Sequence, residues 1–229
     1  MQIDVFTLFP EWFSWFFRQR HVGNALRLGH DLRLFNYRDT TPLAHGQVDD
    51  TPYGGGAGMV IRVDVVDAAL TAVYGPPRER PAAWQIAVLA PSGRLFDDAV
   101  AGELAARERL TLLCGRYEGI DERVREHLAD DAISAGRYVL SGGELAAMTI
   151  ADAVLRKLPG TLGSSESTRE ESFSPALGGG PEYPHYTRPS AYRGWEVPDV
   201  LRSGDHERVR RWRLDESARR AGGQPDAVR

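Results

Sequence analysis

Apolar residues in the first 160 positions fall into short continuous runs and longer amphipathic stretches. The runs are bounded by turn-forming residues and predict strands over residues 3–8, 32–35, 86–90 and 110–114, with 138–140 as a further candidate. The amphipathic stretches predict helices over residues 64–74, 97–108, 121–129 and 144–158, several of them with Asp near the start, where a carboxylate favours a helix. This alternation predicts an α/β fold with a mainly parallel sheet covered by helices.

Four aromatic residues follow Pro10 at a spacing typical of a helix. Trp12, Phe13, Phe16 and Phe17 recur at i, i+1, i+4 and i+5. We therefore expect a helical segment whose aromatic stripe belongs to the core.

The regular pattern stops after residue 161. Residues 162–182 include 11 Gly, Ser or Pro among 21 positions and show no apolar periodicity, which indicates a linker or a functional loop. A helix is predicted again over residues 205–220. We expect three parts: an α/β domain over 1–161, a flexible linker over 162–182 and a small helical module over 183–229.

Composition narrows the class of protein. The chain has 229 residues, of which 42% are hydrophobic and 26% charged, as in ordinary globular proteins, and its one cysteine excludes an internal disulfide. No apolar run is long enough to span a membrane and no secretory signal is seen, so we expect a cytoplasmic protein.

Charge is distributed unevenly along the chain. The net charge is −4, yet residues 183–229 contain ten Arg against seven acidic residues. Such a basic module suits RNA or DNA, although a solvated helix face is the alternative explanation.

Three glycine-containing loops occupy equivalent positions. Residues 90–93, 114–119 and 140–143 each follow an apolar run and precede a helix. In open α/β sheets the ligand crevice lies at the carboxyl ends of the strands, so together the loops could enclose a nucleoside-like cofactor. The alternative is that the glycines only form tight turns.

Other common sites are not supported. The glycine run at residues 54–58 lacks the pattern of a phosphate loop or a dinucleotide fingerprint, and instead predicts a mobile loop carrying Asp49 and Asp50. The six histidines show no zinc-binding spacing, and packing is the expected role of Cys114.

Several longer motifs resemble one family. They are CGRYEGIDERV at 114–124, YVLSGGEL at 138–145, VDDTPYGGG at 48–56, PHYTRP at 184–189 and RRWR at 210–213. They are similar to motifs of the bacterial tRNA (guanine-N1) methyltransferases, which modify the guanosine immediately 3′ of the anticodon. The resemblance extends over nearly the whole chain.

The resemblance implies a SPOUT-class α/β domain with a deep trefoil knot, a homodimer, tRNA as the partner and S-adenosylmethionine as the cofactor, with Mg²⁺ as a possible second cofactor. It also implies the cofactor-binding residues, of which Glu118 is in addition the candidate metal ligand. These are Leu89, Pro91, Gly115, Tyr117, Glu118, Ala135, Gly136, Arg137, Tyr138, Val139, Leu140, Ser141, Gly142 and Gly143.

By the same resemblance, Arg156 stabilises the guanine O6 and an acidic residue in the linker is the general base. The family places an Asp directly before Ser-Phe, whereas this chain has Glu171 there, with Glu170 as the local competitor. The implied substrate-binding residues are Asp50, His185, Arg188, Arg208, Arg210 and Arg211. We expect the terminal helical module to be shorter than the family's.

Two alternative functions stay open at this point. One is a related SPOUT methyltransferase that acts on another RNA guanosine. The other is a protein that binds RNA and the cofactor without turnover, because Glu171 replaces the family's Asp.

Overall fold

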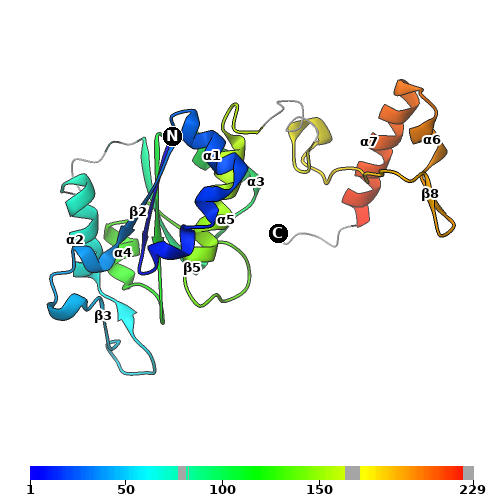
Figure 1. Ribbon diagram of the computed structural model, residues 1–229. Helices are drawn as coiled ribbons and strands as arrows, with labels where there is room; N and C mark the ends of the chain where they lie inside the picture. Colours follow the sequence, from blue (N-terminus) through cyan, green and yellow to red (C-terminus); the bar gives the residue numbers. More distant parts are fainter. Residues whose placement is uncertain (77–80, 82, 163–170, 224–229) are drawn as a thin grey trace. The chain divides into compact units, whose positions relative to one another are not determined.

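The computed structural model describes residues 1–76, 81, 83–162 and 171–223 (Figure 1). Its contacts separate a first compact unit, Met1–Leu162, from a second, Gly163–Arg229. Each unit is described by itself.

The first unit is built on a five-stranded parallel sheet with the strand order β2-β1-β6-β5-β7. Its strands are β1 (Gln2–Thr7), β2 (Asp31–Asn36), β5 (Trp84–Leu95), β6 (Arg109–Cys114) and β7 (Asp131–Ser134). The predicted mainly parallel α/β fold is confirmed.

Helices cover both faces of the sheet (Figure 1). One face carries α1 (Arg20–Arg27), α3 (Asp98–Ala105) and α5 (Glu144–Lys157), and the other carries α2 (Val63–Tyr74) and α4 (Glu122–His127). Alternation along the strands separates the two cores, since Leu112 packs with the α5 side and the adjacent Leu113 with the α2 side.

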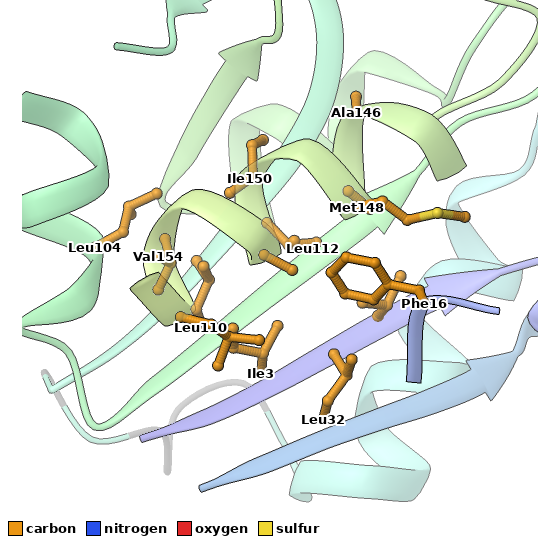
Figure 2. Close-up of a cluster of buried hydrophobic side chains, with 14 of the residues drawn as sticks. Ile3, Phe16, Leu32, Leu104, Leu110, Leu112, Ala146, Met148, Ile150 and Val154 are labelled. Atoms are coloured by element: carbon orange, nitrogen blue, oxygen red, sulfur yellow. The ribbon is translucent and has the colours of Figure 1, made fainter. Parts of the chain in front are cut away.

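The core on the α5 side is the larger one. Apolar side chains of α5 pack on those of β1 and β6 (Figure 2). They include Met148, Ile150 and Val154 from the helix and Ile3, Leu110 and Leu112 from the strands. Each fully buried aliphatic side chain contributes about 1.5–3 kcal/mol, so this face fixes the position of α5 and of the loop that precedes it.

The second unit has little regular structure before its long helix. It contains the hairpin β8 (Ala191–Tyr192) and β9 (Trp195–Glu196), the short α6 (Asp199–Arg202) and α7 (His206–Gly223). Residues 171–182 form turns that are fastened to α7: Ser217 Oγ donates to the Pro181 carbonyl at 2.7 Å, and Arg220 Nη1 to the Glu182 carbonyl at 3.0 Å.

The aromatic segment after Pro10 differs from the prediction. It forms two 3-10 helices, Pro10–Phe13 and Phe16–Arg18, instead of one helix. Phe13 and Phe16 are buried, but Trp12 is 40% exposed, because the tighter turn rotates it away from the core.

Five further parts of the chain depart from the sequence analysis. Helix α1 and strand β7 were not predicted, and residues 138–140 form no strand. Residues 90–93, expected in a loop, lie inside β5, where the pairing with β7 shifts between Leu89 and Arg94. Asp49 and Asp50, expected on a mobile loop, form β3 (Asp49–Asp50), which pairs with β4 (Val60–Ile61).

Candidate functional site

A cavity lies at the carboxyl ends of β6 and β7, beside the register shift in the middle of β5, where a ligand crevice is expected in this class of sheet. Its walls come from the bulged part of β5, the loop after β6 and the segment that joins β7 to α5. The lining residues are Leu89, Ala90, Pro91, Gly115, Arg116, Tyr117, Glu118, Gly119, Ile133, Ser134, Ala135, Gly136, Tyr138, Val139, Leu140, Ser141, Gly142, Gly143 and Ala146.

Two of these segments are in direct backbone contact. The Gly143 N–H donates to the Gly115 carbonyl at 2.9 Å, and Arg116 pairs with Gly142 in an isolated antiparallel bridge. A Cβ on Gly143 would lie 2.6 Å from the Cys114 Cα, so only glycine permits this approach. The loop after β6 and the loop before α5 therefore form one wall.

The segment between β7 and α5 is held in a turn by its own hydrogen bonds. Ser134 Oγ donates to the Gly136 carbonyl at 2.9 Å, and the Tyr138 hydroxyl donates to the Ala135 carbonyl at 3.1 Å. A Cβ on Gly136 would lie 2.2 Å from the Tyr138 ring. The apolar residues 138–140 are thus held at the cavity, which explains why an apolar run here is not a strand.

The β3–β4 hairpin is attached to the cavity wall. The Glu118 N–H donates to the Met59 carbonyl and the Ile61 N–H to the Gly119 carbonyl, both at 3.0 Å. A Cβ on Gly58 would lie 2.5 Å from Glu118 Oε1. Asp50, a predicted substrate-binding residue, belongs to this hairpin, with its carboxylate 3.5 Å from Arg62.

A buried carboxylate lies behind the cavity. Glu144, the first residue of α5, is 1% exposed, and its Oε1 accepts from Thr7 Oγ1 at 2.7 Å. Burial, and to a smaller extent the negative charge of Glu144, raise the pKa of the neighbouring Cys114 thiol well above its usual value. The thiol therefore stays neutral, consistent with a packing role.

The structure gathers most of the predicted cofactor residues. All of them line the cavity except Arg137, which is exposed and lies outside the lining. Its neighbours Gly136 and Tyr138 are both among the lining residues.

Arg116 was missed among the predicted residues, although it lines the cavity and lies inside the CGRYEG motif. Its guanidinium lies over the ring of Phe9, 5.0 Å from the centroid, and 5.9 Å from that of Trp12. The CGRYEG motif was the sequence signal that could have identified Arg116. Its aromatic partners lie about a hundred residues earlier in the chain, and no local pattern links them to Arg116.

Arg156 is not brought to this cavity within one copy of the chain. It lies in the last turn of α5, whereas the cavity adjoins the first turn. At 1.5 Å per residue the two ends are about 18 Å apart along the helix axis.

The remaining predicted residues belong to the second unit. Glu171 is half-buried, and Glu170 lies outside the described residues. His185 Nε2 lies 2.8 Å from Glu182 Oε1, and Arg188 is exposed. Arg208, Arg210 and Arg211 are exposed on α7, where Arg208 and Arg211 share a face by their three-residue spacing and Arg210 faces a shallow pocket with Tyr183.

In the described part of the chain, no group of three His, Cys, Asp or Glu side chains is arranged to hold a metal ion. The prediction of a metal at Glu118 gains no support from its surroundings, and no chemical step is assigned to a metal. None of the described helices is both long enough and apolar enough to cross a bilayer.

The fold and site define an α/β protein with a glycine-walled ligand cavity at the carboxyl edge of a parallel sheet. A sequence model of the family described as tRNA (Guanine-1)-methyltransferase TrmD matches residues 1–226. The chain belongs to this family.

Relatives named tRNA (guanine-N(1)-)-methyltransferase agree over almost the full length. One from Dehalococcoides mccartyi (strain CBDB1) is 50% identical over 225 residues, 96% of this chain and 87% of the relative. One from Brevibacillus brevis is 48% identical over 230 residues, 100% of this chain and 91% of the relative, and one from Bacillus cereus (strain B4264) is 47% identical over 221 residues, 96% and 88% respectively.

Proposed function

We propose that this protein transfers a methyl group from S-adenosylmethionine to N1 of the guanosine immediately 3′ of the anticodon in tRNA. The observation that carries the proposal is the cavity, because it gathers the residues at which the chain resembles this family's cofactor site. Family membership supports the reaction class, and the cavity supports the proposed position of the cofactor.

The cavity residues suit a nucleoside with an amino-acid tail. Leu89 and Leu140 offer apolar surface to a base, while the glycine walls leave backbone N–H and C=O groups open to close approach. S-adenosylmethionine, when bound, supplies an electrophilic methyl group on a positively charged sulfur.

Guanine N1 carries a proton at neutral pH, and this proton has to leave as N1 forms its bond to the methyl carbon. We assign Glu171 as the carboxylate that accepts it. Loss of the proton moves negative charge to O6, and the Arg156 guanidinium is assigned to stabilise that charge. S-adenosylmethionine would supply the methyl group and would leave as a neutral thioether that retains the electron pair of the broken carbon–sulfur bond.

The distance between the cavity and Arg156 supports a site made by two copies of the chain. Because the ends of α5 are about 18 Å apart, the arginine of one copy cannot reach a base seated at that copy's own cavity. The proposal therefore includes a homodimer in which the cavity of one copy is completed by Arg156 of the other. The SPOUT-class trefoil knot remains part of this proposal.

The second unit is proposed to hold the tRNA. Its exposed arginines present guanidinium groups suited to phosphate oxygens, and contacts of this kind position RNA without reading its sequence. In this division residues 1–161 bind the cofactor, the 162–182 segment carries the base and 183–229 bind RNA.

The direct test is to incubate the protein with S-adenosylmethionine and unmodified tRNA transcripts, and to map methylated nucleosides by mass spectrometry. The proposal expects 1-methylguanosine 3′ of the anticodon and none in a transcript with adenosine at that position. Methylation of ribosomal RNA instead would favour the related enzyme, and binding of both ligands without transfer would favour the protein without turnover.

A further inference from the structure

Two oppositely charged side chains beside the cavity carry buried atoms without partners. Oε2 of Glu144 and Nη1 of Arg116 have no hydrogen-bond partner in the part of the chain that the structure describes. Burying a charged group without compensation is costly, so such atoms require an explanation.

The two atoms converge on one glycine. The position that a Cβ of Gly142 would occupy lies 2.4 Å from Glu144 Oε2 and 2.9 Å from Arg116 Nη1. The backbone of Gly142 is outside the left-handed region, so the site requires the absence of a side chain and not an unusual conformation. Glycine thus keeps open the space between a carboxylate and a guanidinium.

Each charged group is also held by residues at the end of β1 or shortly after it. Thr7 Oγ1 donates to Glu144 Oε1 and accepts from the Phe9 N–H at 2.9 Å. The Phe9 and Trp12 rings lie under the Arg116 guanidinium. Thr7 therefore orients the buried Glu144 carboxylate and the two rings orient the half-buried Arg116 guanidinium, so that the opposite charges face each other across the space beside Gly142.

We propose that Glu144 and Arg116 form an electrostatic clamp across Gly142 that holds the loop after β6 against the loop before α5. Glu144 acts through Arg116 and is a positioning residue, because only Arg116 lines the cavity. The clamp adds to the backbone contact between Gly143 and Gly115 that joins the same loops. The identity of the cavity's ligand rests on the proposed function; the clamp itself does not.

The first test measures hydrogen exchange at the Gly143 amide in the ligand-free protein. Glu144→Gln and Arg116→Gln should each speed exchange roughly tenfold, and the double variant should exchange no faster than either single variant. Glu122→Gln is the matched control, because Glu122 is the exposed first residue of α4. Should Glu144→Gln unfold, Gly142→Ala keeps both charges, separates them and should give the same increase.

The second test measures S-adenosylmethionine binding by calorimetry. Each single variant should bind S-adenosylmethionine roughly tenfold more weakly than wild type, and the double variant should bind it no more weakly than the single variants. Glu122→Gln should bind it like wild type. If exchange shows the coupling while wild type binds no S-adenosylmethionine, the clamp stands and the proposed function fails. Exchange at Gly143 that is unchanged in Glu144→Gln, or strictly additive effects of the two substitutions, would overturn the clamp.

Discussion

The two ends of helix α5 differ in what they contribute. At its amino end, the Gly143 backbone touches Cys114, and Glu144 is buried behind a cavity with walls already joined by hydrogen bonds. At its carboxyl end, Arg156 and Lys157 are half-buried, and Lys157 pairs with Asp98. One copy of the chain thus builds the proposed cofactor cavity but leaves the proposed catalytic arginine about 18 Å away along the helix.

This difference predicts that cofactor binding and methyl transfer respond to different substitutions. The largest effect is expected at Glu171. Glu171→Gln removes the proposed proton acceptor and should lower the single-turnover rate of methyl transfer by about 10²- to 10⁴-fold, with S-adenosylmethionine affinity unchanged.

The comparison with Glu170 makes this assignment specific. Glu171→Asp should keep most of the rate, because it restores the family's carboxylate, and Glu170→Gln should resemble wild type. A loss confined to Glu170→Gln would move the base by one residue. If both Gln variants keep their rate, the base lies elsewhere, with Asp50 the next candidate.

The next largest effect is expected at the carboxyl end of α5. Arg156→Ala should lower kcat by about 10²- to 10³-fold, because it removes the group assigned to the developing charge on O6. The dissociation constant for S-adenosylmethionine should stay the same, since the cavity is at the other end of the helix. Lys157→Ala, one residue away, is the control and should change neither kcat nor the dissociation constant for S-adenosylmethionine. Weaker cofactor binding in Arg156→Ala would contradict the assignment of cofactor binding and catalysis to opposite ends of α5.

A smaller effect is expected for the shared face of α7. Reversing the charge of Arg208 and Arg211 together should raise the KM for tRNA by roughly tenfold or more and flatten its dependence on salt, because phosphate contacts are lost. The KM for S-adenosylmethionine should not move. Arg219→Glu, at a position paired with Glu216 on the same helix, is the control. Equal changes in both KM values would indicate damage to the fold instead.

The smallest effect concerns Asp121, which follows the cavity wall. A hydrogen bond from Arg123 lowers the pKa of this carboxyl, so the pairing stabilises the fold above the ordinary Asp pKa of about 4 and is lost as the pH falls further. Arg123→Gln should raise the pKa of Asp121 toward its usual value in an NMR titration. Arg125→Gln should leave it unchanged; no shift in Arg123→Gln would contradict this cause.

The sequence predicted the buried strands well, because strands covered on both faces are continuous apolar runs, as in residues 110–114. Strand β7 was missed because it is short and begins with Asp131. Helix α1 was missed because Arg20, Asn24 and Arg27 leave few apolar positions in its eight residues. Residues 138–140 were wrongly predicted as a strand, because their apolar residues line a cavity and only Leu140 also packs against the core.

The site was predictable where it depends on local glycine geometry. The loops containing Gly115 and Gly143 were recognised from their place after apolar runs, and the resemblance extended the set. The Glu144–Thr7 contact and the aromatic support of Arg116 join residues more than a hundred positions apart, and neither has a local pattern. Arg137 was included because of the resemblance, and it does not belong to the lining of the cavity.

The most direct test of a site completed across two copies is subunit complementation. Ser141→Trp should block the cavity and Arg156→Ala should remove the arginine, so the homodimer of each variant should be inactive. The Ser141→Trp homodimer should lose S-adenosylmethionine binding while its Tm stays unchanged, which would confirm that only the cavity is affected. Unfolding the two variants together and refolding them as mixed dimers should restore activity, because one of the two sites then combines an intact cavity with an intact Arg156. Mixed dimers that form but stay inactive would contradict the account, since they would show that each copy must supply both parts of its own site.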